Sequence, residues 1–162
     1  MIAPRLRVLL CGINPSLYSA AVRHHFARPG NRFWRALHGA GFTPRLLSPA
    51  EDRLLLGHGL GLTNLVARAT ASASELRREE LLDGRRRLAR KVTRFAPRFL
   101  AILGIGAFRS AFAEPEAQVG RQRTRLGSTQ LWVLPNPSGL NAHFQIDELV
   151  AAFRELRIAA RS

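Results

Sequence analysis

The sequence predicts an α/β fold in which helices cover both faces of a mainly parallel sheet. Three short runs, Arg7–Cys11, Phe99–Leu103 and Leu131–Leu134, are almost continuously apolar, as strands buried on both faces are. Segments with helical start signals or helical length separate these runs, which is the order of βα units. No repeat or linker interrupts the 162 residues, so we expect one domain, residues 1–162.

The first half of the chain is expected to alternate strand, loop and helix. After the strand Arg7–Cys11, the segment Gly12–Gly30 is rich in turn formers and shows no clear period, and Arg32–Ala40 is a short helix. A serine, a proline and a glutamate three residues after the serine predict a helix from Ser48 to about Gly57. Leu60–Val66 is a weaker strand candidate.

In the second half, a capping box at Ser72–Glu75 is expected to open a long basic helix that ends near Phe95. Gly84 interrupts that helix at a cost of about 1 kcal/mol. The later elements are expected in this order: the strand Phe99–Leu103, a helix from Gly104 through Phe112, a polar loop or hairpin at Gln118–Thr129, the strand Leu131–Leu134 and a final helix at Ile146–Ile158.

The charge balance indicates a polyanionic partner. The formal net charge is +14, from 25 basic and 11 acidic residues, and Lys91 is the only lysine. Arginine grips phosphate with a planar, five-donor fork, so nucleic acid is the expected partner. A compositional bias spread over the surface is the alternative. Arg85–Arg87 and the set Arg121, Arg123 and Arg125 are accordingly either phosphate contacts or solvated faces.

Several other classes of protein are disfavoured by composition. No apolar run is long enough to cross a membrane, and the first residues lack the form of a signal peptide, so a cytoplasmic location is expected. Cys11 is the only cysteine and is expected to be a buried, inert thiol; no metal site or cofactor is predicted. The pair Gly104 and Gly106 lacks the third glycine of a dinucleotide fingerprint, because Arg109 stands there.

Two unusual loops are expected to line one cleft. Gly12–Tyr18 and Pro135–Asn141 both follow carboxyl ends of strands, where ligands bind in such sheets. Asn14 is the one side chain in the first loop's Gly-Ile-Asn-Pro turn with both donor and acceptor groups; it either does chemistry or supports the turn. Leu140 is either a probe on a stiff loop or a residue that folds back onto the core.

Together with the segment Phe26–Trp34, which reads FARPGNRFW, these loops resemble the mismatch-specific uracil/thymine DNA glycosylases of the uracil-DNA glycosylase superfamily. The resemblance extends from about Leu6 to Leu156. It implies a three-layer α/β sandwich around a short, mainly parallel sheet. It also implies a monomeric, cofactor-free enzyme that flips uracil out of a G-mismatched duplex, with thymine and modified cytosine left open as further substrates. Such an enzyme hydrolyses the N-glycosidic bond and leaves an abasic site.

The resemblance also implies residue roles. Asn14 matches the asparagine that orients the hydrolytic water, and Phe26 the aromatic that stacks on the flipped base. Ser16 lies where the family places a main-chain N–H near the pyrimidine edge, and Asn136 lies close to the base and sugar. The segment that wedges into the vacated stack and contacts the opposite guanine comprises Gly139, Leu140 and Asn141, and the flanking Ser138 and His143 are assigned to DNA binding with it.

The sequence departs from the family pattern at three positions. Ser16 replaces a glycine, Ala67 replaces an acid in the stretch Leu65–Arg68, and His143 stands near the wedge in place of an arginine. The first change bears on the width of the pocket, and the last on the preference for an opposite guanine.

The sequence leaves alternatives open for two sets of residues and for the function. Asp83 on the basic helix is a rival general base, or a surface acid paired with arginine. His24 and His25 either contact phosphate or form a solvated pair. A non-catalytic module that binds distorted duplex is the alternative function, and a nucleotide-dependent Rossmann enzyme is a weaker one.

Overall fold

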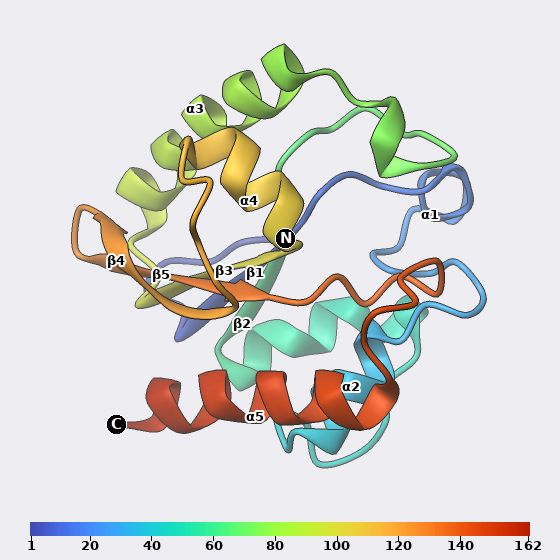
Figure 1. The fold of residues 1–162 in the computed structure, drawn as a ribbon. Coiled ribbons are helices and arrows are strands. Elements are labelled where there is room, and N and C mark those ends of the chain that lie inside the picture. The colour runs from blue at the N-terminus through green and yellow to red at the C-terminus, as the bar shows by residue number, and fades with distance from the viewer.

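The computed structural model describes residues 1–162 and has a five-stranded sheet in the order β2-β1-β3-β5-β4 (Figure 1). Strand β1 (Val8–Gly12) lies between β2 (Leu60–Asn64) and β3 (Phe99–Leu103), parallel to both, and β3 is parallel to β5 (Thr129–Leu134). Only β4 (Gly120–Leu126), at the edge, is antiparallel. The predicted mainly parallel α/β sheet is therefore confirmed.

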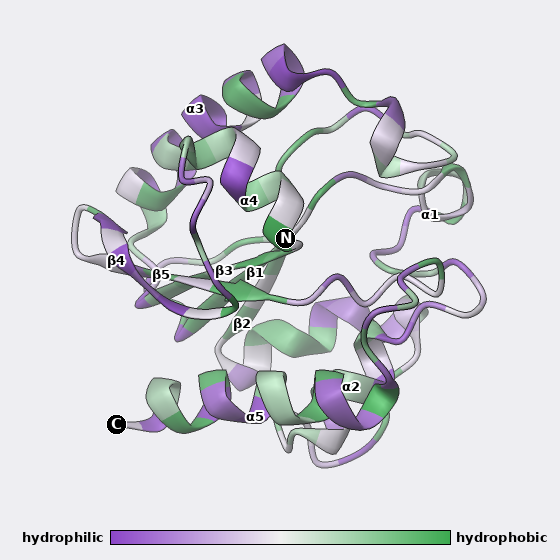
Figure 2. Ribbon diagram, viewed as in Figure 1, coloured by the Kyte–Doolittle hydropathy of each residue, from purple (hydrophilic) through white to green (hydrophobic).

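Helices cover both faces of the sheet and complete the three layers (Figures 1 and 2). Helices α2 (Phe33–Gly39) and α5 (Ile146–Arg161) pack together on one face with the 3₁₀ helix η1 (Pro49–His58), while α3 (Arg78–Phe95) and α4 (Ile105–Phe112) cover the other. Strand alternation divides the core between the two faces: Val8 and Leu10 join the first cluster, and Leu9 and Cys11 the second. Three fully buried strands, β1, β3 and β5, explain the three apolar runs in the sequence.

Two parts of the predicted secondary structure are wrong. The segment expected to have no regular structure contains a short helix, α1 (Leu17–Val22), which begins because the Ser16 hydroxyl accepts a hydrogen bond from the Ser19 N–H at 3.0 Å. The capping box at Ser72 opens only a single 3₁₀ turn, η2 (Ala73–Glu75). Leu76 then takes extended backbone and packs against the core, so α3 begins afresh at Arg78.

Gly84 is required by packing. A Cβ on this residue would lie 2.3 Å from the Leu65 carbonyl oxygen, so the missing side chain lets α3 approach the chain that follows β2. The polar segment Gln118–Thr129 is a hairpin between β4 and β5, which settles the alternative that the sequence left open. None of the helices is long and apolar enough to span a membrane.

Cys11 lies within β1 and is fully buried. Burial raises the pKa of its thiol to about 12, so the sulfur stays protonated and unreactive at neutral pH. The expectation that Cys11 is buried is confirmed.

Candidate active site

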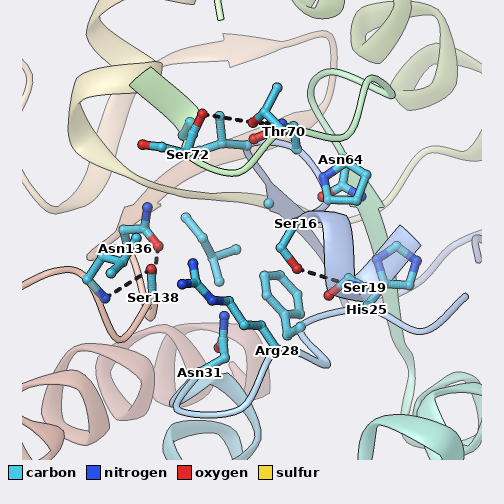
Figure 3. Close-up of a pocket in the computed structure, with 18 of the residues that line it drawn as sticks. Ser16, Ser19, His25, Arg28, Asn31, Asn64, Thr70, Ser72, Asn136 and Ser138 are labelled. Carbon is cyan, nitrogen blue, oxygen red and sulfur yellow. Dashed lines mark hydrogen bonds between the residues drawn. The ribbon is translucent and has the colours of Figure 1, made fainter. Parts of the chain in front are cut away.

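A cavity of about 210 Å³ opens at the carboxyl ends of the parallel strands (Figure 3). Its walls come from the loops after β1, β2 and β5 and from the segment that precedes α2. In Figure 3, Thr70 and Ser72 lie on one side of it and Arg28 and Asn31 on the opposite side. The sequence-predicted residues that line this cavity are Asn14, Ser16, Phe26, Asn136, Ser138 and Leu140.

The amide of Asn14 is held in one orientation. Its Nδ2 donates to the Arg68 carbonyl oxygen and to the Thr70 hydroxyl, each at 2.8 Å. Because a backbone carbonyl can only accept, the nitrogen must face Arg68 and the oxygen Oδ1 must point the other way. Both N–H groups are therefore used within the chain, and Oδ1 remains as an acceptor.

The loop after β2 supplies those partners because it runs beside the loop after β1. The Leu65 N–H donates to the Gly12 carbonyl at 2.8 Å, and the Thr70 N–H donates to the Pro15 carbonyl at 3.2 Å. The Thr70 hydroxyl in turn donates to the Ser72 carbonyl at 2.8 Å. The position of Asn14 thus depends on a second loop, about 50 residues further along the chain.

An ion pair anchors this second loop to α3. The Arg68 guanidinium donates to both carboxylate oxygens of Glu80, at 2.8 and 3.0 Å. The hydrogen bond from Arg68 lowers the pKa of the Glu80 carboxyl to about 2, so this pair stays charged at physiological pH. Ala67, where the family pattern has an acid, is exposed. Arg68 forms its ion pair with Glu80 on α3.

Phe26 presents an aromatic ring at the cavity. Its ring stacks on the fully buried Phe33, with centroids 4.0 Å apart and planes at 20°. The backbone at Phe26 is left-handed, with φ of 52°. A Cβ on Gly12 would lie 3.1 Å from the Phe26 ring and 2.7 Å from Asn64 Oδ1, so this glycine leaves room for both side chains.

Ser16 has a local role that glycine could not fill. Its hydroxyl caps α1, and the residue lines the cavity from the start of that helix (Figure 3). Compared with glycine at this position, the serine therefore adds a side-chain helix cap at the wall of the pocket, worth only about a few tenths of a kcal/mol.

Residues 136–144 form a loop, here called the Leu140 loop. Hydrogen bonds that the side chains of Asn136 and Asn141 form with other residues of the loop hold it closed. Asn136 Oδ1 accepts from the Ser138 N–H at 2.9 Å, and Asn141 Nδ2 donates to the Asn136 carbonyl at 2.9 Å. Leu140 at its tip is 65% exposed, so it is not a core residue. His143 is also exposed; its N–H donates to Asn141 Oδ1 at 3.1 Å, and it does not line the cavity.

Asp83 lies apart from the cavity. Its carboxylate pairs with Arg86 at 2.9 Å on α3, and its side chain is 61% exposed. Of the two residues predicted for catalysis, only Asn14 lines the cavity.

His24 and His25 line the cavity and are half-buried. Both are held by the buried Asp52, whose Oδ2 lies 3.3 Å from His24 Nδ1 and accepts the His25 N–H at 3.5 Å. Burial lowers the pKa of the His25 imidazole, so this ring is neutral at physiological pH. His24 and His25 are therefore anchored by Asp52 at the wall of the cavity. No three acidic, histidine or cysteine side chains lie close enough to hold a metal ion.

Sequence reasoning missed several residues that build the site. Asn64 ends β2 and lines the cavity, as Asn14 and Asn136 do after β1 and β5. A polar amide after the carboxyl end of each strand was a usable signal for it. Thr70 and Asp52 carried no such signal, because their contacts join segments distant in the sequence.

The fold and the cavity define an α/β protein whose ligand site is built from amides and an aromatic ring at the carboxyl ends of parallel strands, beside a protruding leucine. Residues 1–157 match the family model of the Uracil DNA glycosylase superfamily, and the chain belongs to that superfamily. Its members are DNA glycosylases, hydrolases that act on uracil-type lesions in DNA.

Proposed function

We propose that this protein removes uracil from G·U-mismatched duplex DNA as a monofunctional glycosylase and leaves an abasic site. The observation that carries the proposal is the fixed amide of Asn14 in the cavity. With Nδ2 bound to Arg68 and Thr70, Oδ1 is left to accept a hydrogen bond from a water molecule and to hold it in place.

The base would enter the cavity after leaving the duplex. Extrusion costs a few kcal/mol, and least for a mismatched base, which favours uracil opposite guanine. Phe26 offers a ring face, with stacking worth about 1–3 kcal/mol. The Asn64 and Asn136 amides carry the donors and acceptors that a pyrimidine edge requires, and both line the cavity.

Hydrolysis then needs little more than a positioned water. As the glycosidic bond breaks, its electron pair leaves with uracil and the sugar gains oxocarbenium character. N–H donors near the base would stabilise the departing anion. The water held by Asn14 forms the new bond to the sugar carbon and loses its proton to solvent. Because an amide oxygen is a weak base, catalysis rests on orientation and the enzyme should be slow.

Leu140 would fill the space that the base vacates. Leu140 is exposed at the tip of a loop that its own hydrogen bonds hold closed. An apolar side chain that inserts between bases needs both this exposure and this support. Gly139 and Asn141 flank it and would face the opposite strand and its guanine, and Ser138 would contact the DNA beside them. The net charge of +14 would supply sequence-independent attraction to phosphate.

A strand-scission assay tests the proposal. The protein is incubated with a labelled G·U duplex, and abasic sites are cleaved with alkali. We expect scission that requires the alkali and persists in a chelator. Mismatch binding without base release would instead identify a non-catalytic module that recognises distorted duplex. Scission without alkali would contradict the monofunctional assignment.

A further inference from the structure

One side chain, Arg32, holds the Leu140 loop against the rest of the molecule. Its backbone N–H donates to the Pro137 carbonyl at 3.0 Å. Its guanidinium donates to four carbonyl oxygens of the same loop: Pro137 at 3.4 Å from Nε, Ser138 at 2.8 Å and Asn141 at 3.0 Å from Nη2, and Phe144 from Nη1. The loop has no helix or strand to satisfy these carbonyls, so Arg32 fixes its backbone.

Helix stability does not account for Arg32. It is the N-cap residue of α2, where a cation opposes the helix dipole, and its side chain makes no capping hydrogen bond. The chain's ion pairs do not include it, so a half-buried guanidinium is balanced by carbonyl dipoles alone. Its contacts are directed to the Leu140 loop.

The segment around Arg32 also builds the base pocket. Phe33, the next residue, supports the ring of Phe26, and Asn31 lines the cavity while its Oδ1 accepts the Phe33 N–H at 2.9 Å. The loop touches this segment at a second point: a Cβ on Gly139 would lie 2.8 Å from the Gly30 carbonyl oxygen. Figure 1 shows the loop before α5 beside the chain that enters α2. The stacking ring and the Leu140 loop are therefore joined at adjacent residues.

We propose that Arg32 is a positioning residue that couples the Leu140 loop to the base-stacking segment, so that Leu140 occupies the duplex gap while Phe26 holds the base. The inference rests on the proposed base-flipping function. Lysine at this position would keep the charge. Its single ammonium nitrogen could not replace the three guanidinium nitrogens that contact different carbonyl oxygens of the loop. Recognition of a gap in the stack should then depend on Arg32 as much as on Leu140.

Binding of two duplexes tests this coupling without requiring catalysis. The two duplexes are identical except that one carries a stable tetrahydrofuran analogue of an abasic site opposite dG. Fluorescence anisotropy gives the ratio of the protein's affinities for the two duplexes. We expect the wild-type protein to prefer the gapped duplex, and Arg32→Lys and Leu140→Ala each to reduce that preference on the order of tenfold. The double variant should lose no more than either single one, because both act through one loop.

Two further variants complete the design. Gly139→Ala displaces the loop from Gly30 without altering Arg32, and should lower the preference in the same way. Arg35→Lys, on the exposed side of α2, is the matched control and should leave the preference unchanged. Tm is measured for every variant.

Three results would overturn the coupling: a wild-type protein without preference, additive losses in the double variant, or an Arg32→Lys protein that loses affinity for both duplexes equally. A preference that depends on Arg32 in a protein that releases no uracil would contradict the proposed function and leave the coupling standing.

Discussion

The amide nitrogen of Asn14 lies 2.8 Å from the hydroxyl oxygen of Thr70, on a loop that follows a different strand. Thr70 and the Arg68 carbonyl together occupy both N–H groups of that amide. The orientation of the proposed water ligand is thus set by the loop after β2, which links the rate of excision to residues that need not touch DNA.

Thr70→Val should slow excision without weakening DNA binding. The variant keeps the shape of the side chain but removes one acceptor of Asn14 Nδ2. A lost hydrogen bond of about 1 kcal/mol corresponds to a fall of roughly fivefold in the single-turnover rate on a G·U duplex. Thr70→Ser retains the hydroxyl and serves as the control. Equal rates for valine and threonine would show that Thr70 does not orient Asn14.

Gly84→Ala should destabilise the protein by about 1–3 kcal/mol, although alanine favours helix formation. The reason is the 2.3 Å separation between the new Cβ and the Leu65 carbonyl oxygen. Gly106→Ala in α4 is the matched control, because a Cβ there meets nothing within 4 Å and should stabilise the helix. Urea denaturation measures both. A stabilised Gly84→Ala protein would mean that α3 does not approach Leu65, in the chain after β2, this closely.

Cys11 should resist thiol reagents in the native protein. Its thiol is fully buried with a pKa of about 12, so almost no thiolate exists at pH 8. Absorbance with an aromatic disulfide reagent should show no reaction under native conditions and one thiol per chain in denaturant. Rapid labelling of the native protein would place the thiol at the surface.

The free energy of unfolding should decrease as the pH is lowered, in part because of His25. Burial lowers the pKa of its imidazole below the ordinary value of 6.5, so the unfolded chain binds the proton more readily than the folded one. The contribution is fully present above pH 6.5 and is lost as the pH falls toward the folded-state pKa. His25→Gln should therefore lose less unfolding free energy between pH 7.5 and pH 5.5 than the wild type, as urea titrations would measure. An identical pH dependence would contradict this.

Strands β1, β3 and β5 were predictable because they are buried on both faces and read as uninterrupted apolar runs. Helix α1 was not, because its six residues lack an apolar period and form around the Ser16 cap. The start of α3 was misplaced because a capping box records a local turn, whereas the packing of Leu76 decides whether the helix continues.

The residues lining the candidate site were predictable only in part. Asn14, Phe26 and Asn136 belong to short motifs at the ends of strands or before a helix, and all three line one cavity. The partners that hold them are contacts between distant segments, such as Arg68 with Asn14 and Arg32 with the Leu140 loop. A single sequence carries no record of such pairs.

The role of Asn14 in positioning water is decided by the single-turnover rate of uracil excision from a G·U duplex by Asn14→Ala, measured beside Asp83→Asn. Asn14→Ala should lose about a hundredfold or more of the rate while its affinity for the duplex is unchanged, because an amide that positions water acts mainly in the transition state. Asp83→Asn should match the wild type, since Asp83 pairs with Arg86 away from the cavity. A mild loss of rate in Asn14→Ala with a collapse in Asp83→Asn would show that Asn14 does not position the water and that the Asp83 carboxylate is the base.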